Sequence, residues 1–289
     1  MLHPKTVIVG CGDIGRRVAP LCLGVDNEVV AWVKTEASFL ACRKIGLEVH
    51  RSDLDQTAKF SLPRSKHQIL YTVPPPPHGK KDTRLSTLLG QLNANDISKF
   101  VLISTTGVYG DCAGAWVDET TLIKPKADRA LRRADAEASL QAWAKHHAVE
   151  YLILRVPGIY APDRLPLKRL KAGTPVVKRD QAPWTNRIHA DDLARACFAA
   201  LNSQISQQII NITDDAPCSM SEYFFAVADY AGLPHPPEID LETARQTLSP
   251  GMLSYLSESR RIVNGKMKDL LQLKLRYPNL KSGLSPNKG

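Results

Sequence analysis

The sequence predicts an α/β protein with a doubly wound parallel sheet and a smaller lobe formed mostly by the C-terminal part of the chain. Short β-branched runs alternate with longer helical stretches over the first half of the 289 residues, as in βαβ units. These runs are continuously apolar, which is typical of strands that helices cover on both faces. We expect a core domain over residues 1–162, with residues 187–213 returning to it, and a lobe over residues 163–289.

The individual elements follow from where apolar runs begin and where Gly, Pro and polar residues interrupt them. The expected strands of the core are Thr6–Val9, Val29–Val33, Leu47–His50, His67–Val73, Phe100–Ser104, Tyr151–Arg155 and Ile209–Ile212. The expected helices run from Gly15 to about Leu23, over residues 36–45, from Ala127 to about Lys145, and onward from Asp191. Four prolines, Pro74–Pro77, end the fourth strand because proline cannot donate to the ladder. Beyond Pro162 we expect a short basic helix, a strand at Arg187–His189 and irregular structure over the last 75 or so residues.

A glycine motif stands between the first strand and the first helix. Gly10-Cys11-Gly12-Asp13-Ile14-Gly15 has the spacing G-x-G-x-x-G. In a Rossmann-type fold the first glycine permits a tight turn, the second lets the backbone approach a pyrophosphate, and the third lets helix and strand pack closely. The helix N-terminus adds free N–H groups and partial positive charge. The motif in this context predicts a dinucleotide cofactor.

Residues at the end of the second strand bear on which dinucleotide is bound. Lys34, helped by Arg16 or Arg17, would neutralise a 2′-phosphate and favours NADP. Glu36, two residues later, would instead accept the ribose hydroxyls of NAD. The expected cofactor is therefore NADP or NAD, with NADP preferred.

Five further fragments follow one another in the order found in a known family. They are Asp53-Leu54, residues 104–110 (STTGVYG), Asp118-Glu119 with Pro125, residues 155–162 (RVPGIYAP) and residues 188–193 (IHADDL). The chain thereby resembles the extended short-chain dehydrogenases/reductases of the NAD-dependent epimerase/dehydratase group, and more closely their atypical members. The motif and the resemblance together imply these cofactor-binding residues: Gly10, Gly12, Asp13, Ile14, Gly15, Arg17, Lys34, Asp53, Leu54, Thr72, Val73, Arg133 and Pro157.

The resemblance also implies a Tyr-x-x-x-Lys pair on the helix after the fifth strand, in which the tyrosine transfers a proton. Counting back from Glu137, these two positions hold Arg129 and Arg133. Arginine stays protonated and is a poor proton shuttle, although Arg133 can still bind ribose hydroxyls or phosphate. The catalytic candidates that remain are Thr105, at the Ser/Thr position of the family, and Tyr109 in the Val-Tyr-Gly segment.

The formal net charge of +9 is unevenly distributed. Residues 164–179 contain six basic and no acidic side chains, residues 258–289 eight and two, and residues 180–257 three and ten. Basic blocks are usually solvated faces, and these lack the interleaved aromatics of a nucleic-acid binder, so nucleic acid is disfavoured as a partner. Both blocks fall in the expected lobe, which favours an acidic small molecule as substrate.

Composition and cysteine spacing narrow the class of protein further. No apolar run reaches the roughly 18 to 20 residues of a membrane span, and the start of the chain is interpreted as a first strand and not as a signal peptide. The six cysteines show no metal-ligand spacing, so we expect free thiols, no metal and a cytoplasmic location. A homodimer stays open.

The function expected from the sequence is hydride transfer. The substrate is expected to be small, with phosphorylated compounds and sugar nucleotides among the options. The alternative is a catalytically silent NADP(H)-binding sensor or regulatory protein.

Overall fold

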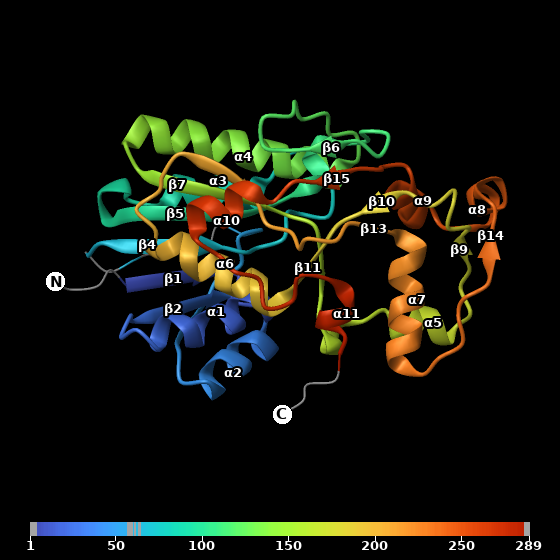
Figure 1. Cartoon of the computed structure of the whole chain (residues 1–289). Helices are drawn as coiled ribbons and strands as arrows, with labels where there is room; N and C mark the ends of the chain where they lie inside the picture. Colours follow the sequence, from blue (N-terminus) through green and yellow to red (C-terminus); the bar gives the residue numbers. More distant parts are fainter. Residues whose placement is uncertain (1–4, 57–59, 61, 63–64, 286–289) are drawn as a thin grey trace.

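The computed structural model describes residues 5–285 apart from 57–59, 61, 63 and 64 (Figure 1). Within these residues, seven parallel strands form the central sheet in the order β12-β7-β5-β4-β1-β2-β3. The strands are β1 (Lys5–Val9), β2 (Val29–Val33), β3 (Glu48–Arg51), β4 (His67–Tyr71), β5 (Ile97–Thr105), β7 (Glu150–Val156) and β12 (Gln208–Asn211). The predicted doubly wound parallel sheet is confirmed. Its strand order reverses between β1 and β4, which is where such sheets bind ligands.

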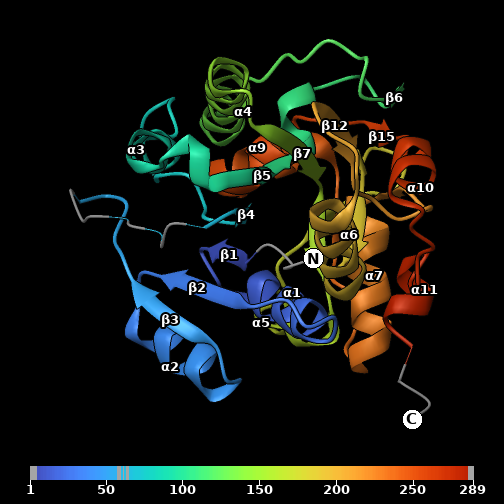
Figure 2. The same cartoon turned by 90° about the vertical axis from the view of Figure 1, so that its left-hand side faces the viewer.

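Helices cover both faces of the sheet (Figure 2). One face carries α1 (Asp13–Leu23), α2 (Glu36–Lys44), α6 (Ala190–Asn202) and α10 (Gly265–Leu271); the other carries α3 (Thr83–Gln91) and α4 (Asp128–His147). Side chains alternate between the two resulting cores, so Ile8 packs in the first, and Val7 and Val9 pack in the second. Burial on both faces explains why the strands are continuously apolar in sequence.

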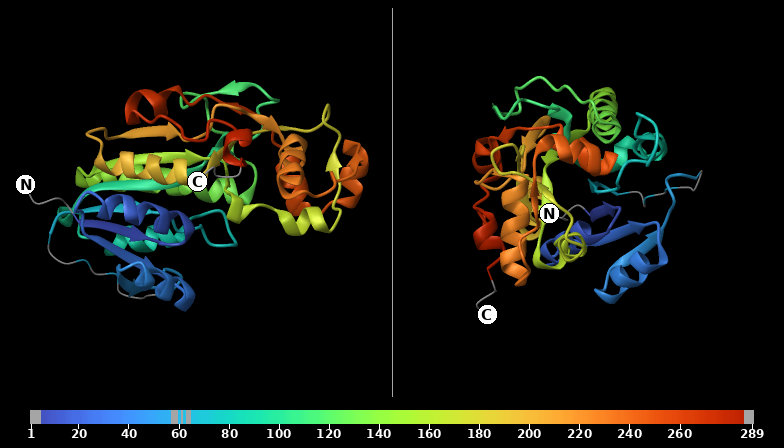
Figure 3. Two further views of the ribbon diagram at one scale, coloured as in Figure 1. Left: turned by 60° about the horizontal axis from the view of Figure 1, so that its bottom comes forward. Right: turned by 90° about the vertical axis from the view of Figure 1, so that its right-hand side faces the viewer.

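The lobe stands at one end of the sheet (Figure 3). Its helices are α5 (Leu167–Lys171), α7 (Met220–Ala231), α8 (Leu241–Thr247), α9 (Pro250–Leu256) and α11 (Leu280–Gly283). Short strand pairs join it together and to the core: β9 (Val176–Val177) with β14 (Glu238–Ile239), β10 (Trp184–Thr185) with β13 (Cys218–Ser219), β8 (Gly158–Tyr160) with β11 (Arg187–His189), and β6 (Trp116–Val117) with β15 (Arg261–Ile262). Single-turn 3-10 helices occupy Ala94–Asp96, Thr106–Tyr109 and Pro162–Arg164.

Two expectations about the C-terminal part differ from the structure. The last 75 residues are not irregular: α7 alone has 12 residues and begins at a capping box in which Ser219 and Glu222 bond reciprocally. Residues 261–275 also do not stay in the lobe, because Met267 and Leu271 pack in the core between α6 and the sheet. The boundary predicted at residue 163 therefore leaves out a second return of the chain to the core.

None of the helices in the described part of the chain is both long and apolar enough to cross a membrane.

Candidate functional site

The loop between β1 and α1 contains three glycines, and two of them, Gly10 and Gly15, are required for steric reasons. Gly10 has a φ of +86°, and a Cβ there would lie 2.8 Å from the backbone nitrogen of Val73. A Cβ on Gly15 would lie 2.9 Å from Cγ2 of Ile8, so glycine lets α1 approach β1. Gly12 is the N-cap of α1 and supplies no side-chain cap, which leaves the first N–H groups of the helix available to an anion. The loop has the shape that a pyrophosphate requires.

A cavity of about 340 Å³, the first cavity, opens beside this loop at the carboxyl ends of β1 and β2. Trp32 and Phe60, whose ring centroids lie 4.1 Å apart, form part of its apolar wall. A phosphate at the glycines and a flat adenine ring against this wall fit the arrangement. Six predicted cofactor residues line the cavity: Gly10, Gly12, Lys34, Asp53, Leu54 and Val73.

The cations of the first cavity are already paired with carboxylates. Lys34 Nζ lies 3.0 Å from Asp53 Oδ1 and 2.8 Å from Asp55 Oδ2. Arg84 donates to both carboxylate oxygens of Asp55, each at 2.6 Å. The Arg84 and Lys34 hydrogen bonds hold the pKa of Asp55 well below its usual range. The charge that suggested NADP from the sequence is therefore balanced in the structure.

The other predicted cofactor residues do not line the first cavity. They are Asp13, Ile14, Gly15, Arg17, Thr72, Arg133 and Pro157. Arg17 is the clearest correction: its Nε, Nη1 and Nη2 atoms lie 3.1, 2.7 and 2.6 Å from the carboxylates of Asp13, Asp191 and Asp163. Every nitrogen of the guanidinium faces a carboxylate, so Arg17 is not free to bind a 2′-phosphate.

Three of these residues support the glycine loop from behind. Thr72 Oγ1 donates to the carbonyl of Gly10 at 2.6 Å. Ile14 and Gly15 are buried where α1 packs on the sheet. Their contribution is to the position of the loop and not to the wall of the cavity.

A second cavity of about 240 Å³ lies at the carboxyl ends of β5 and β7, against the lobe. Thr105 lines it, and its Oγ1 accepts a hydrogen bond from the backbone N–H of Gly107 at 3.1 Å. The hydroxyl proton of Thr105 is therefore free to be donated into the cavity. Pro157, predicted to hold the cofactor, lines this cavity instead of the first. The charged side chains in its lining are Arg129, Arg187, Arg260 and Glu258.

Comparison with known proteins shows which family model and which proteins this chain resembles. Residues 83–213 match the family model described as the NAD dependent epimerase/dehydratase family. The matched segment is less than half of the 289 residues. Among solved structures, it is similar to a functionally unknown conserved protein from Silicibacter pomeroyi DSS, with 29% identity, a TM-score of 0.86 and coverage of 98% of this chain and 97% of the other. The UDP-glucuronic acid 4-epimerase of Bacillus cereus in complex with NAD shares the fold, with 18% identity, a TM-score of 0.76 and coverage of 97% and 94%.

Curated relatives match over shorter segments. A dTDP-glucose 4,6-dehydratase from Streptomyces niveus is 32% identical over 38% of this chain, and a 3-diazoavenalumate denitrifying reductase from Streptomyces sp is 26% identical over 52% of it. The matched segments span 35% and 51% of the length of these two relatives.

Helix α4 carries arginines where the resemblance placed a tyrosine and a lysine. The helix contains no tyrosine, and its one lysine, Lys145, lies in the last turn. Arg129 donates to the hydroxyl of Ser254 and, at 3.2 Å, to its carbonyl. Its guanidinium also lies 4.1 Å from the ring centroid of Tyr255. Arg129 thus fastens α9 of the lobe onto α4.

Arg133, unlike Arg129, lines neither the first nor the second cavity. It is buried, donates to the carbonyl of Val73 at 3.1 Å and lies 3.6 Å from Asp82 Oδ2. Burial lowers the pKa of Arg133 from its usual value. The predicted contact with the cofactor is therefore replaced by support of Val73, which does line the first cavity.

Tyr109 is a second correction, this time to the catalytic candidates. Its side chain is fully buried, and its hydroxyl donates to Asn211 Oδ1 at 2.9 Å. The Arg155 guanidinium lies 4.8 Å from the ring centroid, and burial raises the pKa of the tyrosine. Tyr109 lines neither the first nor the second cavity and has a packing role.

Tyr255 is the residue that the sequence did not single out. It lines the second cavity together with Thr105 and Arg129, and 54% of it is exposed. In the described part of the chain its hydroxyl makes no hydrogen bond. No motif marks this position, because Tyr255 comes from α9, in a segment that the sequence predicts to be irregular.

Proposed function

We propose that this chain binds NAD at the glycine loop and transfers a hydride between the cofactor and a small anionic substrate held between core and lobe. The observation that carries the proposal is the second cavity, which the Thr105 hydroxyl lines together with three arginines and a single carboxylate. This cavity opens at the same carboxyl edge of the parallel sheet as the glycine loop. The name of the family and the reductase among the curated relatives support this reaction class.

We infer NAD as the cofactor because Lys34 is paired. A 2′-phosphate would have to displace Asp53 or Asp55 from Lys34 Nζ, whereas ribose hydroxyls can donate to Asp53 without breaking either ion pair. Gly10 and Gly12 would hold the phosphates, and Leu54 would contact the adenine.

When bound, the nicotinamide ring of NAD supplies or accepts the hydride. The protein has to hold the reacting oxygen and move a proton. Thr105 donates a hydrogen bond to that oxygen, and the arginines hold the anionic part of the substrate.

Tyr255 is the group that we propose for the proton transfer. The arginines keep their protons, and Glu258 is paired with Arg260 at 3.0 Å and lies 3.7 Å from Arg129. In the direction of reduction, the carbonyl oxygen receives the Tyr255 proton, and solvent restores it.

Stopped-flow absorbance at the nicotinamide band tests the proposal, with NADH and a panel of small carbonyl acids. We expect turnover by the native chain and a loss of about 100-fold or more in the Thr105→Val variant. Saturable NADH binding without turnover across the whole panel would overturn the enzymatic assignment.

One observation favours a second candidate, a catalytically silent cofactor-binding regulator. Arg129 joins α4 to α9, so a dinucleotide that shifts α4 would also shift the lobe. This candidate predicts that NADH changes the hydrodynamic radius or the oligomeric state in size-exclusion chromatography while no substrate turns over. An unchanged elution volume with saturating NADH would count against it.

A further inference from the structure

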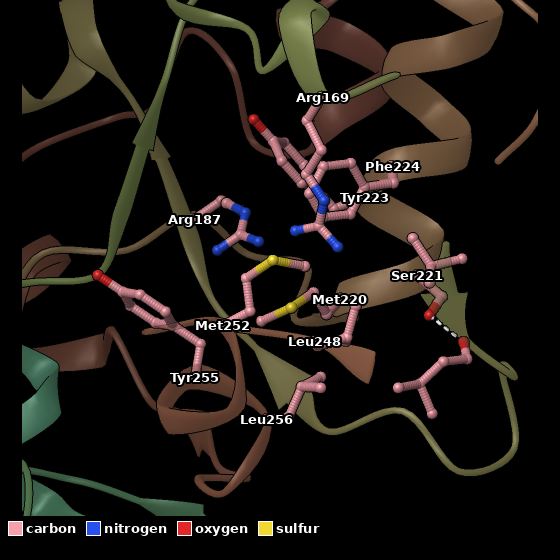
Figure 4. Close-up of a pocket in the computed structure, with 12 residues that line it drawn as sticks. Arg169, Arg187, Met220, Ser221, Tyr223, Phe224, Leu248, Met252, Tyr255 and Leu256 are labelled. Atoms are coloured by element: carbon pink, nitrogen blue, oxygen red, sulfur yellow. Dashed lines mark hydrogen bonds between the residues drawn. The ribbon is translucent and has the colours of Figure 1, made fainter. Parts of the chain in front are cut away.

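A third cavity, the lobe cavity, has a volume of about 220 Å³ and lies between α7, α9 and β9 (Figure 4). Its lining residues are Arg169, Val176, Val177, Arg187, Met220, Ser221, Tyr223, Phe224, Leu248, Met252, Tyr255 and Leu256. The two arginines are the only ionised side chains among them. Both guanidinium groups turn toward the space beside Met220 and Met252.

Each arginine is held by an aromatic ring instead of by a carboxylate. The Arg169 guanidinium lies 4.1 Å from the ring centroid of Phe224, and that of Arg187 lies 4.2 Å from the ring centroid of Tyr223. Among the described residues neither forms an ion pair, and the Nε atoms of both are buried without a hydrogen-bond partner. Burial lowers the pKa of Arg169, since nothing compensates its charge.

The few hydrogen bonds that these arginines make leave donors unused. Arg169 Nη2 donates to the carbonyl of Pro175 at 3.2 Å, and Arg187 Nη1 donates to the carbonyl of Asn186 at 3.1 Å. A Cβ on Gly158 would lie 2.4 Å from Arg187 Nη1, so glycine at that position leaves the room that the guanidinium occupies. A guanidinium stacked on a ring keeps its edge free for a carboxylate or phosphate, which binds in the same plane.

The nearby Asp214 does not neutralise Arg187 at neutral pH. Asp214 is buried and accepts a hydrogen bond from the Ala216 N–H at 3.3 Å. Burial raises the pKa of Asp214 to about 8, although the Arg187 charge acts in the opposite direction. The carboxyl is therefore mostly protonated at pH 7, and the positive charge of the lobe cavity persists.

Apart from the hydroxyls of Tyr223 and Tyr255, the rest of the lining offers no side chain free to form a hydrogen bond with a polar ligand. The hydroxyl proton of Ser221 is not available to a ligand, because it is donated to the carbonyl of Val177. The lining includes no Asn, Gln, Asp or Glu side chain. The two methionines and two leucines form an adaptable apolar surface. The polar edges of a nucleobase or the hydroxyls of a sugar would find only these two tyrosine hydroxyls here and would lose most of their hydrogen bonds to water.

We propose that the lobe cavity binds an amphipathic organic anion, with Arg169 and Arg187 on its carboxylate or phosphate and an acyl or aromatic body against Met220, Met252 and Leu256. The lobe cavity shares Arg187, Met220 and Tyr255 with the second cavity. The anion is therefore the substrate class of the reaction proposed above. This last step rests on the proposed function; binding of the anion does not.

Isothermal titration of the full chain without cofactor tests the binding. The probes are octanoate and octyl phosphate, compared with octanol, acetate and UDP-glucose. We expect saturable binding of at least one of the two anionic probes, with octanol and acetate at least about tenfold weaker because each lacks one half of the recognition. Equal affinity for octanol, or tighter binding of UDP-glucose than of both anions, would overturn the proposal.

Variants locate the site. Arg169→Met keeps most of the volume and removes the charge, and we expect it to weaken anion binding by about tenfold. Arg179→Met is the matched control, because Arg179 also stacks on a phenylalanine, 4.3 Å from the ring centroid of Phe225, yet is exposed and outside the cavity. Leu256→Trp fills the cavity without touching a charge and is expected to abolish binding. Equal affinities in all three variants would overturn the proposal, and thermal melts verify that each is folded.

The result is separable from that of the proposed function. Anion binding without hydride transfer would leave the lobe cavity as assigned and remove the enzymatic role. Hydride transfer to carbonyl acids without anion binding in the lobe cavity would keep the enzymatic role and remove the assignment of the lobe cavity.

Discussion

The first cavity and the lobe cavity each contain two cationic side chains, which are paired with carboxylates in the first cavity and stacked on aromatic rings in the lobe cavity. Lys34 and Arg84 face Asp53 and Asp55, so the first cavity is electrically balanced. Arg169 and Arg187 lie on aromatic rings with no carboxylate paired to them among the described residues. The first cavity therefore recognises its ligand mainly through backbone shape at the glycines. The lobe cavity recognises its ligand mainly through uncompensated charge.

Loss of the Tyr255 hydroxyl gives the largest expected effect, because this residue lies where the lobe cavity meets the second cavity. In Tyr255→Phe we expect the rate of hydride transfer to fall about 10²- to 10⁴-fold, since a positioned acid or base contributes that much. Binding of NADH and of octanoate should stay within about twofold of the native values. Single-turnover stopped flow measures the rate. Tyr230→Phe, on the exposed side of α7, is the control, and equal rates in both variants would exclude Tyr255 as the proton donor.

Shape recognition in the first cavity is tested by adding one methyl group. Gly10→Ala places a Cβ against Val73 and demands a positive φ, so we expect NADH binding to weaken about 10- to 100-fold. Gly46→Ala is matched, because Gly46 has a φ of +81° with no heavy atom within 4 Å of its Cβ position. It should cost about 1 to 2 kcal/mol of unfolding free energy and leave NADH binding unchanged. Tryptophan fluorescence quenching by NADH measures the NADH affinity of both variants. Similar affinities in the two variants would show that the loop does not hold the cofactor.

Much of the first cavity could be predicted from the sequence, because its signals are local. The glycine motif directly follows β1, and burial on both faces makes the strands continuous apolar runs. The pairing of charges could not be predicted in this way. Arg17 meets Asp163 and Asp191, which are 146 and 174 residues away in the chain. Net charge counted along the sequence cannot show whether a cation has a partner.

The lobe was less predictable for a related reason. Apart from α7 its helices are short, and the cavity is lined by residues from α5, α7 and α9 that belong to no motif. The basic segment 164–179 did point to an anionic ligand, yet only Arg169 of its six basic residues lines the lobe cavity. Tyr255 lacked any local signal.

Removing the carboxylate partner of Lys34 and Arg84 should leave uncompensated positive charge in the first cavity, as in the lobe cavity. Asp55→Asn removes the carboxylate shared by Lys34 and Arg84, so we expect the affinity ratio of NADPH to NADH to rise about tenfold. Competition titrations with the two cofactors give the ratio. Asp96→Asn, in the 3-10 helix Ala94–Asp96 and outside the first cavity, is the control. An unchanged ratio in Asp55→Asn would mean that Lys34 is not the residue that discriminates between the cofactors.

The pH dependence of Asp214 gives a smaller effect on the lobe side. Its pKa is raised to about 8, so between about pH 4 and pH 8 the folded state keeps a proton that the unfolded state has lost. The free energy of unfolding should fall as pH rises through this window and level off above it. Asp214→Asn should flatten this slope and gain about 1 kcal/mol or more at pH 8.5.

The same titration affects Arg187. Above pH 8 the ionised Asp214 becomes a counter-charge, so octanoate binding by the native chain should weaken, and the Asp214→Asn variant should not show this loss. Thermal melts and titrations at pH 6.5 and 9 measure both effects. Asp180→Asn, at an exposed turn of the lobe, is the control, because the Asp215 charge contributes to the raised pKa of Asp214. Parallel pH slopes in the native chain and Asp214→Asn would contradict the assignment.

The central claim is that the first cavity recognises its ligand by backbone shape and the lobe cavity by charge. It is tested most directly by titrating NADH and octanoate against both the Gly10→Ala and the Arg169→Met variants. The structure predicts a reciprocal pattern: Gly10→Ala loses NADH and keeps octanoate, and Arg169→Met keeps NADH and loses octanoate. If either variant loses both ligands while remaining folded, or if neither loses any, the two cavities do not divide recognition in the way described.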